Sequence, residues 1–209
     1  MRLLTEPYAE QQVHWPAKGR HILAQYDDTT VVVYQAYRPE IGEWAAEHGH
    51  LGGPAFSLGR MSWVKPNFLW MMFRSGWGTK EGQEITLAIR VRRSAFDEML
   101  AQAVHSSPVD AVYGDKERWK DAVARSNVRL QWDPDHGPGG APLERRALQL
   151  GLRGDVLRLF AHEWIVDLED ISPFVAEQRG RGDDLVTPRE RVYPVADPVV
   201  AARLGIDTP

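Results

Sequence analysis

The residues best suited to chemistry lie between positions 60 and 80, where cationic side chains and tryptophans alternate. Four cations and three tryptophans spaced seven residues apart occur there: Arg60, Lys65, Arg74, Lys80, Trp63, Trp70 and Trp77. No Asp or Glu occurs between Glu47 and Glu81. Guanidinium and ammonium groups hold phosphates while bases stack on indoles, so the stretch predicts a site for a nucleotide or single-stranded nucleic acid. A tryptophan-rich core helix with a solvated basic rim explains the same residues equally well.

Polar side chains on predicted strands, or close to one, form a second set of candidates. Gln131 and Gln149 are candidate catalytic groups that could orient a reacting ribose, and Tyr34 is a third that could stack on a ring. The further candidates for ligand binding are Arg20, Gln35 and Arg129. Gln35 shares its strand face with valines, so a core glutamine with satisfied hydrogen bonds is the favoured interpretation, and a ligand contact is the alternative.

Two carboxylates and an imidazole occur close together at Asp133, Asp135 and His136. They could form a general acid–base pair or bind a metal. Asp-Pro also commonly ends a strand, and a structural role is the favoured interpretation of Asp133. His48 and His50 form an H-x-H pair without a third ligand at a helpful spacing, so no metal site is predicted.

Several sharp signatures of enzyme families are absent. The chain has no G-x-x-x-x-G-K-[ST], no G-x-G-x-x-G after a strand, no H-E-x-x-H and no G-x-S-x-G. P-loop and Rossmann-type dinucleotide sites are therefore not expected.

Length and composition predict one soluble domain. A chain of 209 residues can bury one sizeable core, and 43% hydrophobic and 26% charged residues are ordinary for a globular protein. A net charge of −4 argues against a generally basic surface, so any polyanion must meet a local patch. The chain lacks cysteine, a signal-peptide pattern and a membrane-length apolar run, and the cytoplasm is the expected location.

Hydrophobic periodicity predicts the elements that must position these side chains. Strands are predicted at 21–26, 30–37, 61–64, 83–92, 128–132, 143–152 and 164–171. Helices are predicted at 5–14, 39–47, 66–74, 94–104, 115–125, 155–162 and 173–178, with a loop at 133–140. The expected fold class is α+β, a single domain with a largely antiparallel central sheet and packed helices. Residues 1–180 form that domain, and residues 181–209 an extended tail packed on it.

Six blocks along the chain resemble the domain-of-unknown-function 4291 family. They are VVVYQAY, RMSWVKPNFLWMMFRSGWGTKEGQE, VRLQWDPDH, RRALQLGL, WIVDLEDI and RERVYP, and the resemblance spans roughly residues 20–194. The chain departs from the family pattern at His21, where glutamine is usual, and at Leu23, where arginine is usual. A third departure is Asp135-His136, where an acid is usually followed by arginine. The resemblance implies relatives without implying an activity.

The leading functional hypothesis is an enzyme that acts on a nucleotide or nucleic acid. Group transfer from NAD of the ADP-ribosyltransferase kind is the form to test first, because such sites use strand-borne Arg, Tyr and Gln or Glu without a Rossmann fingerprint or a metal. This is an analogy at the level of the fold. The alternatives are a non-catalytic module that binds single-stranded nucleic acid through the same patch, and a partner-binding protein with tryptophan hot spots.

Overall fold

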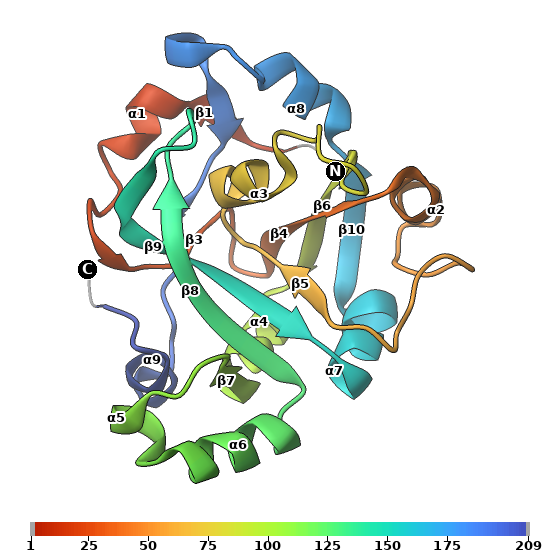
Figure 1. The fold of residues 1–209 in the computed structure, drawn as a ribbon. Helices are drawn as coiled ribbons and strands as arrows, with labels where there is room; N and C mark the ends of the chain where they lie inside the picture. The colour runs from red at the N-terminus through yellow and green to blue at the C-terminus, as the bar shows by residue number, and fades with distance from the viewer. Residues whose placement is uncertain (1–2, 208–209) are drawn as a thin grey trace.

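Two β-sheets form the framework of the computed structural model, which describes residues 3–207 (Figure 1). The first sheet is antiparallel, with strand order β10 (Ile165–Asp170), β6 (Ile85–Arg92) and β4 (Thr30–Tyr37). The second has the order β2 (Gly19–Arg20), β9 (Pro142–Leu152), β8 (Val128–His136) and β7 (Ala103–His105), and β5 (Ser62–Val64) also pairs with β9. Its central pair, β8 with β9, is antiparallel. The predicted α+β fold, with largely antiparallel sheets and packed helices, is confirmed.

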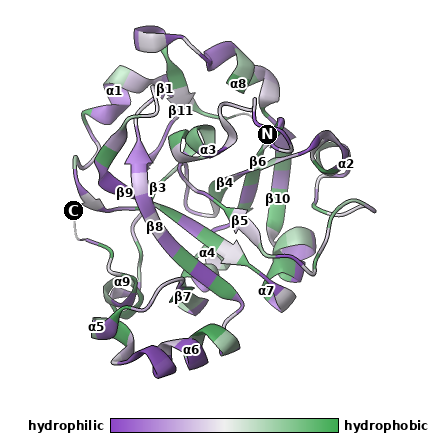
Figure 2. Ribbon diagram, viewed as in Figure 1, coloured by the Kyte–Doolittle hydropathy of each residue, from purple (hydrophilic) through white to green (hydrophobic). Residues whose placement is uncertain are grey.

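β4 is buried on both faces because it alternates apolar side chains toward two different cores. Val31 and Val33 belong to the larger core, which extends to β8, β9 and α4 (Arg93–Gln102). Val32 and Tyr34 belong to a second core with α3 (Phe68–Ser75) and α8 (Ser172–Gln178). In β8, by contrast, hydrophobic and hydrophilic bands alternate (Figure 2). One face of β8 therefore remains available for polar side chains.

The other helices surround the sheets. They are α1 (Tyr8–Gln12), α2 (Pro39–His48), α5 (Asp110–Tyr113), α6 (Lys116–Arg125), α7 (Gly154–Leu159) and α9 (Pro198–Leu204), with a π-helical turn at Phe160–Trp164 and a 3₁₀ turn at Gly182–Asp184. α2 ends where predicted because Gly49 adopts a left-handed conformation (φ 72°) that glycine tolerates. Among residues 3–207, no helix combines the length and apolarity needed to cross a membrane.

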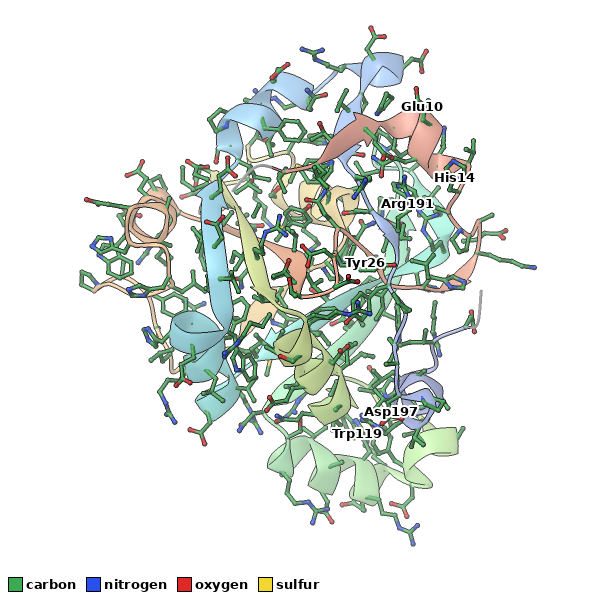
Figure 3. All side chains as sticks on the ribbon, turned by 180° about the vertical axis from the view of Figure 1, so that it is seen from behind. Glu10, His14, Tyr26, Trp119, Arg191 and Asp197 are labelled. Atoms are coloured by element: carbon green, nitrogen blue, oxygen red, sulfur yellow. The ribbon has the colours of Figure 1, made fainter. Side chains whose placement is uncertain are left out.

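Residues 181–207 pack on the domain through two short strands and a helix. β11 (Val186–Pro188) pairs with β1 (Thr5–Pro7), and β12 (Arg191–Val192) pairs with β3 (Leu23–Ala24). Tyr26, labelled with Arg191 in Figure 3, donates its hydroxyl to the carbonyl of Val192 (2.9 Å). Tyr193, Val200 and Leu204 join the larger core. This segment therefore completes two further two-stranded sheets and contributes to the larger core.

Several predicted boundaries are wrong, among them the helix predicted at 94–104, which ends at Gln102 because Ala103–His105 forms β7 beside β8. The helix predicted at 5–14 is a strand at Thr5–Pro7 followed by α1, because the first residues pair with β11. The helix predicted at 155–162 becomes α7 and the π-helical turn. The loop predicted at 133–140 begins later, because β8 continues through Pro134 to His136 opposite β9.

Candidate functional site

A cavity of about 640 Å³ is lined by strands of both sheets and by α3. β8 and β9 supply one wall, and β4 with the residues after it supplies another. β5, α3 and the segment before β5 complete it. Seven of the side chains predicted for the site line this cavity: Gln35, Arg60, Trp63, Lys65, Arg74, Gln131 and Gln149. The structure therefore brings together residues that lie more than 100 positions apart in the sequence.

Strand register explains why the polar side chains converge. Gln131 of β8 lies opposite Gln149 of β9, and Val64 of β5 lies opposite Leu150. Continuing the β5 register by one residue brings Lys65 level with Gln149. Since residues directly opposite on paired strands share a face, Lys65, Gln149 and Gln131 form one row across the sheet. The row lies on the face that borders the cavity.

Trp63 forms the next row and lies directly on the backbone of β9. It is opposite Gly151, where a Cβ atom would come within 3.0 Å of the indole Cε2 and within 2.6 Å of the sulfur of Met61. The missing side chain at Gly151 is what allows this close approach. Trp63 thereby presents a flat apolar wall beside the polar row.

Asp133 provides the negative charge of the cavity. Its Oδ1 accepts a hydrogen bond from Gln131 Nε2 (2.8 Å), and its Oδ2 accepts one from Gln149 Nε2 (2.7 Å). The two amides fix the orientation of the carboxylate and are themselves oriented by it. The glutamines predicted to be catalytic are thus positioning partners of a carboxylate that also lines the cavity.

Lys65 is the most deeply buried cation of the cavity, at 6% exposed. Among residues 3–207 its amine has no salt bridge or hydrogen bond partner. The pKa of Lys65 is lowered to about 8, first by burial and then by the charge of Arg74, while Asp133 opposes the shift. Strongly perturbed titratable groups in clefts are candidates for functional sites.

Arg60 and Arg74 are exposed, line the cavity and have no carboxylate at salt-bridge distance within the described chain. Arg74 lies in the last turn of α3, with its guanidinium carbon 6.0 Å from the ring centroid of Trp70. α3 is held at its start by Asn67, whose side chain accepts from the amide of Trp70 (2.7 Å). The positive charge facing the cavity is therefore available to a ligand.

A short polar relay lines the wall supplied by β4. Gln35 Nε2 donates to Ser62 Oγ (2.7 Å) and to the carbonyl of Trp63 (3.2 Å), and Ser62 Oγ is 2.8 Å from the hydroxyl of Tyr37. The Oε1 atom of Gln35 is buried without a hydrogen-bond partner. Gln35 is thus only partly satisfied, and both of its predicted roles, core glutamine and ligand contact, retain support.

Five predicted site residues do not reach the cavity. Tyr34 is fully buried in the second core on the opposite face of β4, and Trp77 packs edge-on against Phe68 in that core. Lys80 is exposed outside the lining. Arg129 donates to the carbonyls of Val123 and Ser126 at the end of α6. Arg20 lines a different depression, with His105 and Trp132.

The sequence analysis favoured a structural role for Asp133, which lines the cavity, and it missed the lining residues Tyr37, Arg38, Phe56 and Ser62. Asp133 follows Gln131 by two residues, so strand alternation places both on one face once β8 extends past Trp132. Among residues 3–207, no group of three His, Asp or Glu side chains is placed to hold a metal ion.

Comparison with other proteins places the chain by family alone. A search among curated proteins found no match. Residues 21–193 match the model of a family described as Domain of unknown function (DUF4291), which covers most of the chain, every strand of the two sheets except β2, and the whole cavity lining. The chain therefore belongs to the DUF4291 family.

Proposed function

We propose that the protein is an enzyme that binds a nucleotide in this cavity and transfers a group from it, with NAD as the first candidate. The observation that supports this proposal most directly is the arrangement of charged side chains around the cavity. Arg60, Lys65 and Arg74 face the cavity without salt-bridge partners among the described residues, and Asp133 faces it between two glutamines. A phosphate-bearing ligand would satisfy the cations through charge-assisted hydrogen bonds.

The remaining lining suits the rest of a nucleotide. Trp63, Tyr37 and Phe56 offer aromatic surface for a ring. When a group leaves C1 of a ribose, positive charge develops on the sugar, and a fixed carboxylate stabilises such charge without reorganising. In this proposal Asp133 has that role, while Gln131 and Gln149 hold its oxygens in place.

The burial of the tryptophans favours this proposal over a module for single-stranded nucleic acid. Trp70 is 4% exposed, and Trp77 packs in the second core. Binding of successive bases requires several accessible rings along one groove. The cavity presents one half-buried indole, Trp63, in place of a row of accessible tryptophans.

Replacing Arg74 with glutamine is expected to weaken binding of ADP and NAD by about 10- to 100-fold, because a hydrogen bond to a charged group contributes about 1.5–3 kcal/mol. Adenosine, which lacks phosphate, should be unaffected. The measurement is a thermal-shift titration, in which ligand at 100 times its Kd adds about 2.7 kcal/mol. Lys80→Gln is the matched control, since Lys80 is exposed, cationic and outside the lining.

Two results would count against nucleotide binding. One is that no nucleotide shifts the melting temperature of the wild-type protein. The other is an equal loss of affinity in Arg74→Gln and Lys80→Gln. Binding of oligonucleotides with a steep salt dependence, unaffected by NAD, would instead support the nucleic-acid module.

The catalytic part of the proposal has its own test. Release of nicotinamide from NAD is expected from the wild-type protein, and Asp133→Asn should lower its rate at least tenfold while leaving the affinity for ADP unchanged. Asparagine keeps the size of the side chain and removes its charge. A variant that releases nicotinamide at the wild-type rate would remove Asp133 from the reaction.

A further inference from the structure

Lys65 differs from the other cations of the cavity in how rigidly it is held. Its amide donates to the carbonyl of Tyr34 (3.1 Å), and its carbonyl accepts from the amide of Tyr34 (2.7 Å). The three residues before it pair with β9. The backbone at Lys65 is thus fixed to β4 of one sheet and, through β5, to β9 of the other.

The side chain is buried along its length and borders the cavity. An exposed lysine that binds phosphate is a flexible, strongly hydrated charge, whereas Lys65 is desolvated and confined. Its neighbours are Arg74 on α3, Asp133 on β8 and, by register, Gln149 on β9. Asp133, the one carboxylate among these neighbours, does not form a salt bridge with Lys65 in the described residues.

These surroundings increase the share of uncharged amine. With a pKa of about 8, caused first by burial and then by Arg74, about 10% of the amine is neutral at pH 7, against about 0.03% for an ordinary lysine of pKa ~10.5. Desolvation and a neighbouring cation are the two environments that activate lysine as a nucleophile. The cation next to Lys65 can also hold the anionic end of a substrate.

We propose that Lys65 is a nucleophile that forms an imine with the carbonyl carbon of a phosphate-bearing aldehyde or open-chain sugar. This rests on the proposed function insofar as Arg60 and Arg74 bind the phosphate. The lone pair of the neutral Nζ attacks the carbonyl carbon, and a C–N bond forms as the C=O double bond opens and one proton passes from the nitrogen to the oxygen. The oxygen then leaves as water, taking the second proton of the nitrogen, as the C=N bond forms. Asp133 is the nearby carboxylate that can carry protons between these positions.

The test uses pyridoxal 5′-phosphate as a phosphate-bearing aldehyde, followed by borohydride reduction and peptide mass spectrometry of the full chain. Lys65 is expected to be labelled at least tenfold faster at pH 7.5 than the exposed Lys80 and Lys120. The rate at Lys65 should follow a titration with its midpoint near pH 8. Pyridoxal without phosphate should label it more slowly, and Arg74→Gln should reduce the difference between the two reagents.

Labelling of Lys65 no faster than that of Lys80 would overturn the inference, whatever nucleotides do. If Lys65 is labelled quickly and in a phosphate-dependent way, but ADP and NAD do not protect it, the result would support Lys65 as a nucleophile. It would count against nucleotide binding in the cavity. Protection by ADP would support both. Lys65→Arg keeps the positive charge and should lose the label, because a guanidinium does not form an imine with the aldehyde under these conditions.

Discussion

Replacing Lys65 with methionine is expected to stabilise the protein by about 3 kcal/mol at pH 7. The amine has a pKa of about 8 in the folded protein because burial disfavours its charge, while the unfolded chain has the ordinary value of about 10.5. Each unit of this difference corresponds to about 1.36 kcal/mol of unfavourable interaction with the charged form. Methionine has a similar length and carries no charge, so the unfavourable interaction disappears.

The pH dependence gives the sign of this effect. Between the folded pKa of about 8 and the unfolded value, the unfolded chain binds more protons at Lys65. The wild-type protein therefore gains stability from this residue as the pH rises through that window. The advantage of Lys65→Met is full below pH 8 and absent above about pH 10.5. Arg74 and Asp133 are the charged groups that act on the amine.

Urea unfolding at pH 7 and at about pH 10.5 measures the effect, and Lys80→Met provides the control. Lys80 is exposed, so its replacement should change the free energy of unfolding little at either pH. A destabilised Lys65→Met protein at pH 7, or a gain that does not depend on pH, would contradict the assigned environment of the amine. Lys65→Met is expected to gain stability and to lose ligand binding, because functional sites often lower the stability of the protein that holds them.

Local patterns in the sequence were sufficient for most elements. The run of β-branched residues in β4 predicts a strand, and its alternation predicts that Val31 and Val33 face away from Val32 and Tyr34, as the two cores show. Helix boundaries follow from caps as well. Asp115 accepts from the amide of Arg118 (2.8 Å) at the start of α6.

Pairings between distant residues escaped these patterns. β1 exists because Thr5–Pro7 pairs with Val186–Pro188, and nothing near Thr5 indicates that partner. β8 passes through Pro134, which reads as the end of a strand. Proline is tolerated there because β7 pairs with β8 only as far as Leu130, so the edge beyond needs no donor in the described chain.

The site could be predicted from the sequence where its residues are close together in the chain and lie on the same face of a strand. Arg60, Trp63, Lys65 and Arg74 border the cavity because a strand, a proline and a helix follow one another within one block. Tyr34 and Gln35 are consecutive on one strand, so only one of them can face the cavity. Trp77 was misplaced because its own backbone turns to a positive φ of 56° after Gly76, and its ring packs against Phe68 in the second core.

Replacing Asp135 with alanine is expected to destabilise the protein by about 3–5 kcal/mol, because it leaves a buried arginine without its counter-charge. Arg145 lies with its Nη2 atom 2.6 Å from Oδ2 of Asp135, and its Nε atom donates a hydrogen bond to the same oxygen (2.8 Å). The side chain of Arg145 is only 7% exposed and that of Asp135 only 2%. The other oxygen accepts from the amide of His136 (2.8 Å). Urea unfolding measures the loss.

Glu177→Ala is the matched control, because the Arg181–Glu177 pair is nearly as short (2.7 Å) as the Arg145–Asp135 pair but lies at the surface. The side chain of Arg181 is 42% exposed and that of Glu177 is 59% exposed. An exposed pair contributes about 0–1 kcal/mol, so equal losses in the two variants would refute a structural role for Asp135. A second variant separates the charge from the packing. Arg145→Met in the Asp135→Ala background should recover part of the stability, since it removes the stranded charge.

The Asp135→Ala replacement should also affect the cavity, because Asp135 and Asp133 lie on the same strand, β8. Asp135 fixes the end of β8 to Arg145 of β9, and Asp133 faces the cavity two residues earlier. Freed from that pair, the β8 end would lose the register that brings Asp133 to Gln149. In conditions where Asp135→Ala remains folded, nucleotide affinity should therefore fall too, whereas Glu177→Ala should bind as the wild type does. Unchanged affinity in folded Asp135→Ala would show that the two glutamines alone are sufficient to hold Asp133.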